Sequence, residues 1–279
     1  MTTRTVVVLG AGYVGAAAAQ AFAARGDTVY SVRRHPTPVG AGILALRGDA
    51  GAPDSIRGLP RHVDHVVLAV APAAGADSYE QTYARGAAGA LALARRHDAR
   101  SLVYTSSTGV YGVTDGSWVS EDSAVNARDA DGGALIRAEK TLLDADDVGI
   151  TVLRVAGIYG PGRNPLPRYS QPEALPARGE YYVNLAHRDD IVSAIVLCAE
   201  PPAGPRVFNC GDGQPALAID VARWTCEFVG RPWPETIVFN NPDAVPRSNQ
   251  RIRTDALQAH GWSPAYPSFR EGFRSLRKA

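Results

Sequence analysis

The sequence predicts an α/β protein built on a doubly wound parallel sheet, followed by a smaller C-terminal lobe. Through the first two thirds of the chain, short runs rich in Val, Ile and Thr alternate with stretches of helical composition. These short runs are continuously apolar, which is typical of parallel strands that helices cover on both faces. After about residue 160, proline and glycine become frequent, so a second, less regular part of the chain is expected there.

The first part is expected to supply the sheet and its covering helices. Consecutive strands separated by helices pair in parallel, because each return crossover needs a helix-length connection. The expected strands span residues 5–9, 28–32, 43–46, 63–70, 101–105 and 150–155. The expected helices span residues 13–25, 78–98 and 133–147.

The second part begins with a segment, PGRNPLPRYSQPEALPARG (161–179), whose proline and glycine content predicts a loop or lid. A helix at 189–200 and a strand at 206–210 are expected to return the chain to ordered structure. A helix at 218–230 and a final helical piece then follow.

These boundaries predict two domains that interleave along the chain. The chain is expected to pass from the sheet domain into the lobe, return to the sheet domain and enter the lobe again, because its composition changes at these boundaries. The sheet domain is expected to comprise residues 1–160 with 186–211 returning to it, and the lobe 161–185 and 212–279.

Composition excludes several classes of function. The formal net charge is +1 and no dense run of Lys or Arg occurs, which argues against a surface for nucleic acid. The cysteines, Cys198, Cys210 and Cys226, lack CxxC spacing, so no metal site or disulfide framework is expected. The most apolar stretch is short and contains Gln20, so it cannot span a membrane. We expect a cytoplasmic protein.

A glycine-rich turn, GAGYVG, directly follows the first expected strand. Gly10, Gly12 and Gly15 have the spacing of a dinucleotide-binding turn, with Tyr13 and Val14 between them. In such a turn the first glycine permits the bend, the second admits a pyrophosphate and the third lets the helix pack on the strand. A turn with a purely structural role could have the same glycine spacing. Here, however, the motif lies between a strand and a helix, as dinucleotide binding requires.

The end of the second strand indicates which dinucleotide is bound. NAD sites commonly place an acidic residue there, whereas NADP sites favour arginine for the 2′-phosphate. Arg33 and Arg34 occupy this position, and Asp27 comes too early. The alternative is a pair of solvated arginines. The pattern favours NADP(H) over NAD(H), because guanidinium groups bind phosphate with paired charged hydrogen bonds.

Two further strand ends are expected to contact the cofactor. Asp49 and Ala50 follow the third strand, where a side chain reaches toward an adenine. Small residues end the fourth strand and let the backbone pass close to the cofactor; they are Ala69, Val70 and Ala71. Both assignments rest on position alone, and ordinary strand ends would look the same.

Hydroxyl groups gather at the end of the fifth strand, in YTSSTGVYG (104–112). Thr105 lies where a cofactor contact is expected, and Ser106, Ser107 and Thr108 could polarise a carbonyl oxygen. Tyr111 could donate a proton or stack on a substrate. The alternative is that these residues only cap the turn after the strand.

Several motifs, taken together and in order, carry a resemblance to one family. They are GAGYVG, TSSTGVYG, RVAGIYGPGR, NLAHRDDI and GWSPAYPSFREGF. With these motifs the chain is similar to the extended and atypical short-chain dehydrogenase/reductase superfamily, which includes NAD(P)-dependent epimerases and dehydratases, and its ending resembles a sugar-epimerase-like branch. The resemblance implies a Rossmann-type domain with a small C-terminal substrate-binding lobe.

The resemblance also implies roles for individual residues. Ser107 matches the serine that polarises the substrate, and Lys140 matches the lysine that holds the nicotinamide ribose and lowers the pKa of the catalytic tyrosine. His187 and Asp190 match a region at the junction of the two lobes. The segment that lines the nicotinamide is matched by Ala156, Gly157 and Ile158.

The chain departs from the family pattern at Ile136, which stands where the catalytic tyrosine is expected. Isoleucine cannot transfer a proton. Lys140 follows one helical turn later on the same face, either approaching a cofactor or extending its stem along the core. Tyr111, Glu121, Asp115 and His187 are the candidates to replace the tyrosine, and the sequence does not choose among them.

The predicted function is therefore an NADP(H)-dependent oxidoreductase that acts on a small or medium-sized polar carbonyl or alcohol. Two alternatives remain: a nucleotide-sugar-type epimerase or dehydratase that recycles its cofactor, and a non-catalytic NADP(H)-binding sensor. The expected partner is a small-molecule substrate, with no nucleic acid or membrane, and the architecture is compatible with a homodimer.

Overall fold

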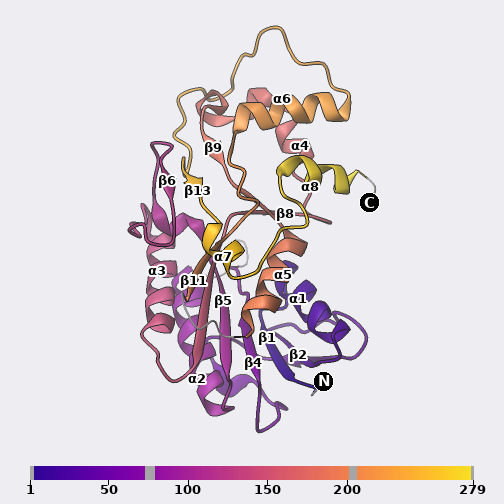
Figure 1. Ribbon diagram of the computed structural model, residues 1–279, viewed down its shortest axis with the longest axis vertical. Helices are drawn as coiled ribbons and strands as arrows, with labels where there is room; N and C mark the ends of the chain where they lie inside the picture. The colour runs from indigo at the N-terminus through magenta and orange to yellow at the C-terminus, as the bar shows by residue number, and fades with distance from the viewer. Residues whose placement is uncertain (1–2, 73–78, 201–205, 278–279) are drawn as a thin grey trace. The chain divides into compact units, whose positions relative to one another are not determined.

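The computed structural model describes residues 3–72, 79–200 and 206–277 of the chain (Figure 1). The chain divides into two compact units, and each unit is formed by three separate segments of the chain. The first unit comprises Met1–Val110, Val125–Arg154 and Ile191–Phe208, and the second comprises Tyr111–Ala124, Val155–Asp190 and Asn209–Ala279.

The first unit is organised around a seven-stranded parallel sheet with the order β11-β7-β5-β4-β1-β2-β3. The chain leaves β1 in one direction through β2 and β3, then returns to β4 on the other side, which confirms the predicted doubly wound fold. The strands are β1 (Thr5–Leu9), β2 (Thr28–Arg33), β3 (Ile43–Arg47), β4 (His65–Leu68), β5 (Ser101–Ser107), β7 (Gly149–Val155) and β11 (Val207–Cys210). β1 and β4 pair with each other, and their carboxyl ends mark the switch point at which such sheets bind ligands.

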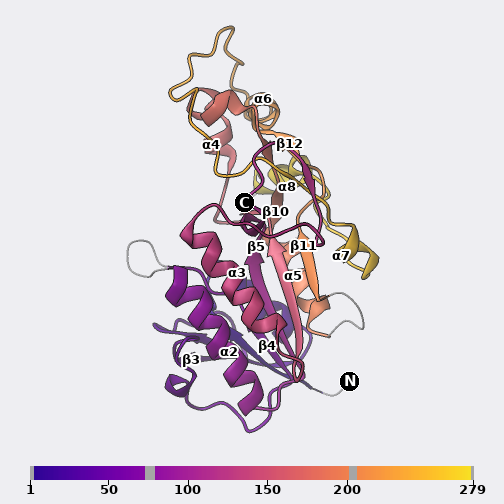
Figure 2. The same cartoon turned by 90° about the vertical axis from the view of Figure 1, so that its left-hand side faces the viewer.

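Helices flank this sheet. Figure 2 shows α2 and α3 side by side, where α2 packs on β4 and β5, while α1 packs on β1 and β2. The helices are α1 (Tyr13–Ala24), α2 (Arg85–Arg96), α3 (Ala130–Leu143) and α5 (Arg188–Cys198), with short turns η1 (Pro53–Ser55), η2 (Glu80–Ala84) and η3 (Thr108–Tyr111).

Two helix boundaries differ from the prediction. The helix expected over 78–98 begins, within the described residues, as a π-helical turn, η2, that continues into α2; residue 78 lies outside them. The helix expected over 133–147 begins earlier and ends earlier, at Leu143. It begins earlier because the Asp129 carboxylate accepts a hydrogen bond from the Gly132 amide at 2.8 Å and so caps the first turn.

The second unit contains short paired strands and small helices. β8 (Gly157–Tyr159) pairs in parallel with β10 (Leu185–His187), β9 (Tyr182–Val183) pairs antiparallel with β12 (Ala216–Leu217), and β6 (Trp118–Val119) pairs in parallel with β13 (Arg251–Ile252). The helices are α4 (Leu166–Tyr169), α6 (Ala218–Val229), α7 (Asp255–Ala259) and α8 (Phe269–Leu276), with turns η4 (Pro172–Ala174) and η5 (Pro176–Gly179).

The segment 161–179, expected to be a loop, therefore contains α4 and two short 3₁₀ turns. Each of these pieces has proline at its first or second helical position, where the missing amide hydrogen breaks no intrahelical bond. Proline in this segment starts helical turns as well as interrupting regular structure.

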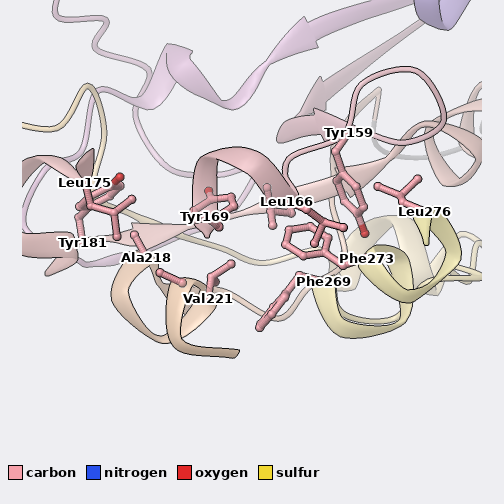
Figure 3. Close-up of a cluster of buried hydrophobic side chains, with 12 residues drawn as sticks. Tyr159, Leu166, Tyr169, Leu175, Tyr181, Ala218, Val221, Phe269, Phe273 and Leu276 are labelled. Atoms are coloured by element: carbon pink, nitrogen blue, oxygen red, sulfur yellow. The ribbon is translucent and has the colours of Figure 1, made fainter. Parts of the chain in front are cut away.

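An aromatic core holds the second unit together (Figure 3). Phe273 meets Tyr159 edge-on, with ring centroids 5.3 Å apart. α8 approaches Tyr159 so closely that a Cβ on Gly272 would lie 1.7 Å from the phenol oxygen. The buried members of the cluster are Tyr159, Leu166, Tyr169, Leu175, Tyr181, Leu185, Ala218, Val221, Ala222, Phe269, Phe273 and Leu276.

Within the part of the chain that the structure describes, no helix is both long enough and apolar enough to cross a membrane. The same residues contain no group of three or more His, Cys, Asp or Glu side chains arranged to hold a metal ion.

Candidate functional site

The three glycines of the first turn each meet a different steric demand. Gly10 has a φ of +86°, and a Cβ there would lie 2.7 Å from the Ala69 carbonyl oxygen. A Cβ on Gly15 would lie 2.3 Å from the Gly10 carbonyl oxygen. On Gly12, the nearest atom to a Cβ would be 3.9 Å away, so this glycine faces open space. The first and third glycines are thus needed for packing, and the second leaves room for a ligand against the backbone.

The open space lies at the N-terminus of α1. Gly12 is the N-cap, no side chain caps the helix, and the first turn carries no acidic residue. Backbone amides at an uncapped helix N-terminus bind anions, because unpaired N–H groups and the helix dipole favour negative charge. Tyr13 and Val14, both half-buried, form this first turn. The turn therefore fits the pyrophosphate of a dinucleotide.

Positive charge gathers at the carboxyl ends of the next two strands. Arg33 ends β2, and its register partner on β3 is Arg47. Arg33 donates a hydrogen bond to the Thr37 hydroxyl at 3.1 Å, and Arg34 beside it is exposed. Within the described residues, neither Arg33 nor Arg47 forms an ion pair with a carboxylate. Arg47 was not among the predicted residues, because its place beside Arg33 depends on strand register.

The remaining predicted cofactor residues of this unit lie at neighbouring strand ends. The Asp49 carboxylate accepts the Gly51 amide at 2.8 Å, so it holds its own turn. Ala50 packs against α2, where a Cβ on Gly89 would lie 2.0 Å from its carbonyl oxygen. Ala69 and Val70, half-buried after β4, form the wall against Gly10, and the exposed Ala71 follows them.

The hydroxyl groups at the end of β5 point in alternate directions, as successive strand residues do. Thr105 donates to the Leu68 carbonyl at 3.2 Å. Ser106 is 6% exposed and donates to the Glu139 carboxylate at 2.6 Å. Ser107 is half-buried, and its oxygen accepts the Gly109 amide at 3.1 Å. Because that contact uses the oxygen, the Ser107 hydrogen remains available to donate to a substrate.

Ser106 belongs to a buried ion-pair network that anchors α3 to the sheet. Arg154 on β7 donates to both oxygens of Glu139, with an Nη2–Oε2 distance of 2.8 Å and an Nε–Oε1 distance of 3.2 Å. Glu139 and Arg154 are 3% and 5% exposed. The network was not predicted, because its three members come from β5, α3 and β7 and share no sequence motif.

Ile136 and Lys140 both lie on α3, one turn apart. Ile136 is half-buried, and Lys140 is exposed. The Lys140 ammonium donates to the Asp144 carboxylate at 2.7 Å, with 73% of the lysine side chain exposed. Lys140 therefore points into solvent rather than lying along the core, and it forms a helix-surface ion pair.

The predicted nicotinamide segment belongs to the second unit. Ala156 is buried and donates its amide to the Cys210 carbonyl at 2.9 Å. Gly157 is exposed, and a Cβ there would lie 2.9 Å from the Asn184 carbonyl oxygen. Ile158 follows in β8. The close contact to Asn184 explains, by packing within the second unit, why residue 157 is a glycine.

Two candidates for the proton donor are tied into one hydrogen-bond network around Asn209. Tyr111 is 2% exposed and donates to the Asn209 amide oxygen at 2.7 Å. Glu121 accepts the Asn209 backbone amide at 2.7 Å. Asp115 is exposed, and hydrogen bonds from Ser117 lower the pKa of its carboxyl. These contacts give all three residues structural roles in the second unit.

His187, the fourth candidate, is 1% exposed and stacks on Tyr266 with ring centroids 3.8 Å apart. Burial lowers the pKa of the His187 imidazole, which favours its neutral form. Tyr159 meets the same imidazole edge-on, with ring centroids 5.3 Å apart.

Burial also raises the pKa of the Asp212 carboxyl to about 7. Among the described residues, the Tyr159 hydroxyl, the His187 Nε2 and the Asp212 Oδ2 are buried without a hydrogen-bond partner.

Comparison with known proteins finds relatives of this chain in sequence and in structure. YeeZ of Escherichia coli strain K12 is 28% identical over 224 residues, which are 77% of this chain and 81% of YeeZ. A 3-diazoavenalumate denitrifying reductase of a Streptomyces species is 28% identical over 172 residues, 53% of this chain and 55% of that protein. The solved structure described as an NAD-dependent epimerase/dehydratase of Methylobacillus flagellatus matches with a TM-score of 0.81 and 28% identity, covering 99% of this chain and 98% of its own.

The family model described as the NAD dependent epimerase/dehydratase family matches residues 6–211, which contain the glycine turn, the Ser107 strand end and α3. This confirms the resemblance drawn from the sequence motifs. With the parallel sheet and the uncapped glycine turn, the match shows that the chain belongs to the NAD dependent epimerase/dehydratase family, a family of NAD(P)-dependent enzymes.

Proposed function

We propose that this enzyme is an NADP(H)-dependent oxidoreductase that interconverts a polar carbonyl compound and its alcohol. The observation that carries the proposal is the combination, in one unit, of an open glycine turn, an arginine cluster at the ends of β2 and β3, and a donor hydroxyl at the end of β5. The turn would hold the pyrophosphate, and the arginines would hold a 2′-phosphate.

The arginine cluster supports NADP(H) in particular. Arg33 and Arg47 are register partners on adjacent strands, and Arg34 follows directly. Arg33 and Arg47 form no ion pair with a described carboxylate, so their like charges repel each other, and a bound phosphate would relieve this repulsion. A ribose 2′-hydroxyl, as in NAD, would instead be recognised by a carboxylate at the end of β2, and Arg33 occupies that position.

Ser107 is the residue that we assign to the substrate oxygen. Its own oxygen accepts the Gly109 amide, so the hydroxyl hydrogen is left to donate to a substrate oxygen. A hydrogen bond from this hydroxyl stabilises the negative charge that develops on a carbonyl oxygen during reduction. When bound, the nicotinamide supplies or accepts the hydride. We propose that the proton is exchanged with water, because α3 presents Ile136 where the tyrosine would stand.

Lys140 is assigned to the cofactor only through its family position. In this structure its ammonium is paired with Asp144. The pair is largely exposed, so the interaction is weak and leaves the side chain free to exchange partners. We propose that Lys140 turns from Asp144 to the ribose when the dinucleotide binds.

A second candidate function is an epimerase or dehydratase that recycles its cofactor, which the family match favours. A reductase among the relatives, matched over 53% of this chain, favours net oxidation or reduction instead. Net change in NADPH absorbance during turnover distinguishes the two. An epimerase would retain bound dinucleotide through purification and would show no net consumption.

Calorimetric titration with NADPH and NADH tests the cofactor assignment. Replacing Arg33 and Arg34 together with Ala should weaken NADPH binding on the order of a hundredfold, since charged hydrogen bonds contribute about 1.5–3 kcal/mol each. NADH binding should change little. Arg25→Ala is the matched control, because Arg25 is exposed at the opposite end of α1.

Equal loss of both dinucleotides in the double variant would contradict the 2′-phosphate assignment. Absence of binding by the wild-type protein would contradict the whole proposal. Tight NADPH binding with no absorbance change across a broad panel of carbonyl compounds would remove the oxidoreductase assignment and leave a binding function.

A further inference from the structure

A two-stranded piece of sheet in the second unit has one buried and one exposed face. β6 and β13 pair in parallel, with Arg251 opposite Trp118 and Ile252 opposite Val119. Val119 and Ile252 are 3% and 2% exposed, whereas Trp118 is 43% exposed. Side chains alternate along a strand, so Arg253 follows Arg251 on the exposed side. We call Trp118, Tyr182, Arg251 and Arg253 the basic aromatic face.

The guanidinium of Arg251 is held in place by three contacts. Its Cζ lies 5.0 Å from the centroid of the Trp118 ring and 4.9 Å from that of Tyr182. Its Nε donates to the Gly116 carbonyl at 2.7 Å. Gly116 is fixed in turn, because its amide donates to the Asn249 carbonyl at 2.9 Å. The Arg251 side chain is thus oriented before any ligand arrives.

The charge of Arg251 is not neutralised within the part of the chain that the structure describes: no carboxylate lies within ion-pair distance, and neither Nη atom has an acceptor. Arg274 lies 5.5 Å from the Trp224 ring and pairs with Glu271 at 3.4 Å, whereas Arg223 lies 5.0 Å from the Trp233 ring and forms no ion pair with a described carboxylate. Arg251 differs from both because it contacts two rings while a backbone carbonyl holds its Nε.

Arg253 adds a second charge to the same face. Its Cζ lies 5.0 Å from the Trp118 ring centroid. Its ion pair with Asp255 is 3.5 Å long, and the two side chains are 54% and 75% exposed, so solvent screens it. Two guanidinium groups thus lie against one exposed indole ring, and the Nη edge of Arg251 is open.

We propose that the basic aromatic face binds a small ligand that carries an oxyanion, a carboxylate or a phosphate, beside a flat conjugated ring. The planar fork of Arg251 donates two parallel hydrogen bonds to the oxyanion, and Arg253 adds charge. The conjugated ring packs against the exposed part of Trp118. This ligand site goes beyond the proposed function and does not depend on it.

Fluorescence of Trp118 tests the proposal without the cofactor or turnover. The difference between wild-type and Trp118→Phe spectra reports this tryptophan alone. The probes are uridine 5′-diphosphate and 4-hydroxycinnamate, which carry the oxyanion as phosphate or carboxylate. Uridine and 4-hydroxybenzyl alcohol are the neutral controls. At least one anionic probe should quench the difference signal saturably, and its neutral counterpart should not.

Arg251→Met should weaken binding of that probe about tenfold or more, because it removes the two charged hydrogen bonds. Arg270→Met is the matched control, since Arg270 also stacks on a ring of this unit, 4.6 Å from the Phe269 centroid. It should leave the affinity unchanged. Dinucleotide binding is measured on the same samples, so failure of the cofactor assignment is recognised separately.

Three results would overturn the proposal: no quenching by either anion, quenching that survives in Arg251→Met, or an equal loss in Arg270→Met. If Arg251→Met also loses dinucleotide binding, Arg251→Lys replaces it under the same criterion, because lysine keeps the charge and lacks the planar fork. The probe that binds distinguishes a nucleotide-type ligand from an aryl carboxylate.

Discussion

Replacing Glu139 with Gln tests whether the buried network holds the first unit together. The substitution keeps the size of the side chain and removes its charge, which leaves the Arg154 guanidinium buried without its carboxylate. Arg154 is 5% exposed and donates to both oxygens of Glu139. Ser106 loses a charged acceptor at the same time.

The expected loss is about 3–5 kcal/mol in the free energy of unfolding, the range for breaking a buried ion pair on one side. An exposed pair of the same chemistry supplies the control. Arg95 donates to both oxygens of Asp147 at 2.7 and 2.8 Å, with side chains 49% and 48% exposed. Asp147→Asn should cost no more than about 1 kcal/mol, because solvent screens the pair. Burial is the main difference between the two pairs.

The assay must report the unit in which the substitution lies. All four tryptophans, Trp118, Trp224, Trp233 and Trp262, belong to the second unit, so indole fluorescence does not follow unfolding of the first. Urea unfolding is therefore followed by circular dichroism at about 222 nm, where the helices of both units contribute, alongside fluorescence. Glu139→Gln should lower the midpoint of the dichroism transition more than that of the fluorescence transition.

Equal shifts of the dichroism midpoint in Glu139→Gln and Asp147→Asn would refute the larger contribution expected of the buried pair. A double variant that also carries Arg154→Met adds a second check. Removing both charges avoids a buried guanidinium that has lost the Glu139 carboxylate, so it should recover part of the stability lost in Glu139→Gln. No recovery would show that the loss came from packing and not from removal of the carboxylate charge.

Two further predictions concern catalysis and pH. Ser107→Ala should reduce turnover by about a hundredfold or more with NADPH affinity nearly unchanged, because it removes a donor to the developing oxyanion; steady-state rates and calorimetry measure this, and undiminished turnover would exclude the serine. Burial raises the pKa of Asp212 from 3.8 to about 7, so the folded protein binds this proton more tightly than the unfolded chain. The stability that this proton confers is fully present below about pH 4 and is lost as the pH rises to about 7. The stability difference between wild type and Asp212→Asn should change over that window by at most about 4 kcal/mol, and a difference independent of pH would refute the shift.

The glycine turn was predictable because its causes are local. Gly10, Gly12 and Gly15 lie within six residues, and the bend, the open backbone and the helix contact all depend on that short segment. Parallel strands were predictable for a similar reason, since a strand covered on both faces has no polar side. Each of these features leaves a complete pattern in one stretch of sequence.

Features that depend on register or on distant pairs left no such pattern. Arg47 stands beside Arg33 only because β2 and β3 pair with that offset. Ser106, Glu139 and Arg154 come from three different elements, β5, α3 and β7, and both charged residues resemble ordinary surface charges in the sequence. The basic aromatic face joins residues more than a hundred positions apart, and its strands are two residues long. Short pairings of this kind have no hydrophobic period from which they can be recognised.

The buried network also explains how the first unit retains its α3 geometry without the family tyrosine. Residues on a helix rotate by about 100° per position, so fixing Glu139 against Arg154 fixes the directions in which Ile136 and Lys140 project. That anchor is independent of the residue at position 136. Loss of a phenol there removes a proton donor without moving the helix or the serine strand, because Ser106 shares the same carboxylate. Under the proposed function, this anchor would keep Ser107 and α3 in order while the proton comes from water, with Ser107 as the polar contact that we assign to the substrate oxygen.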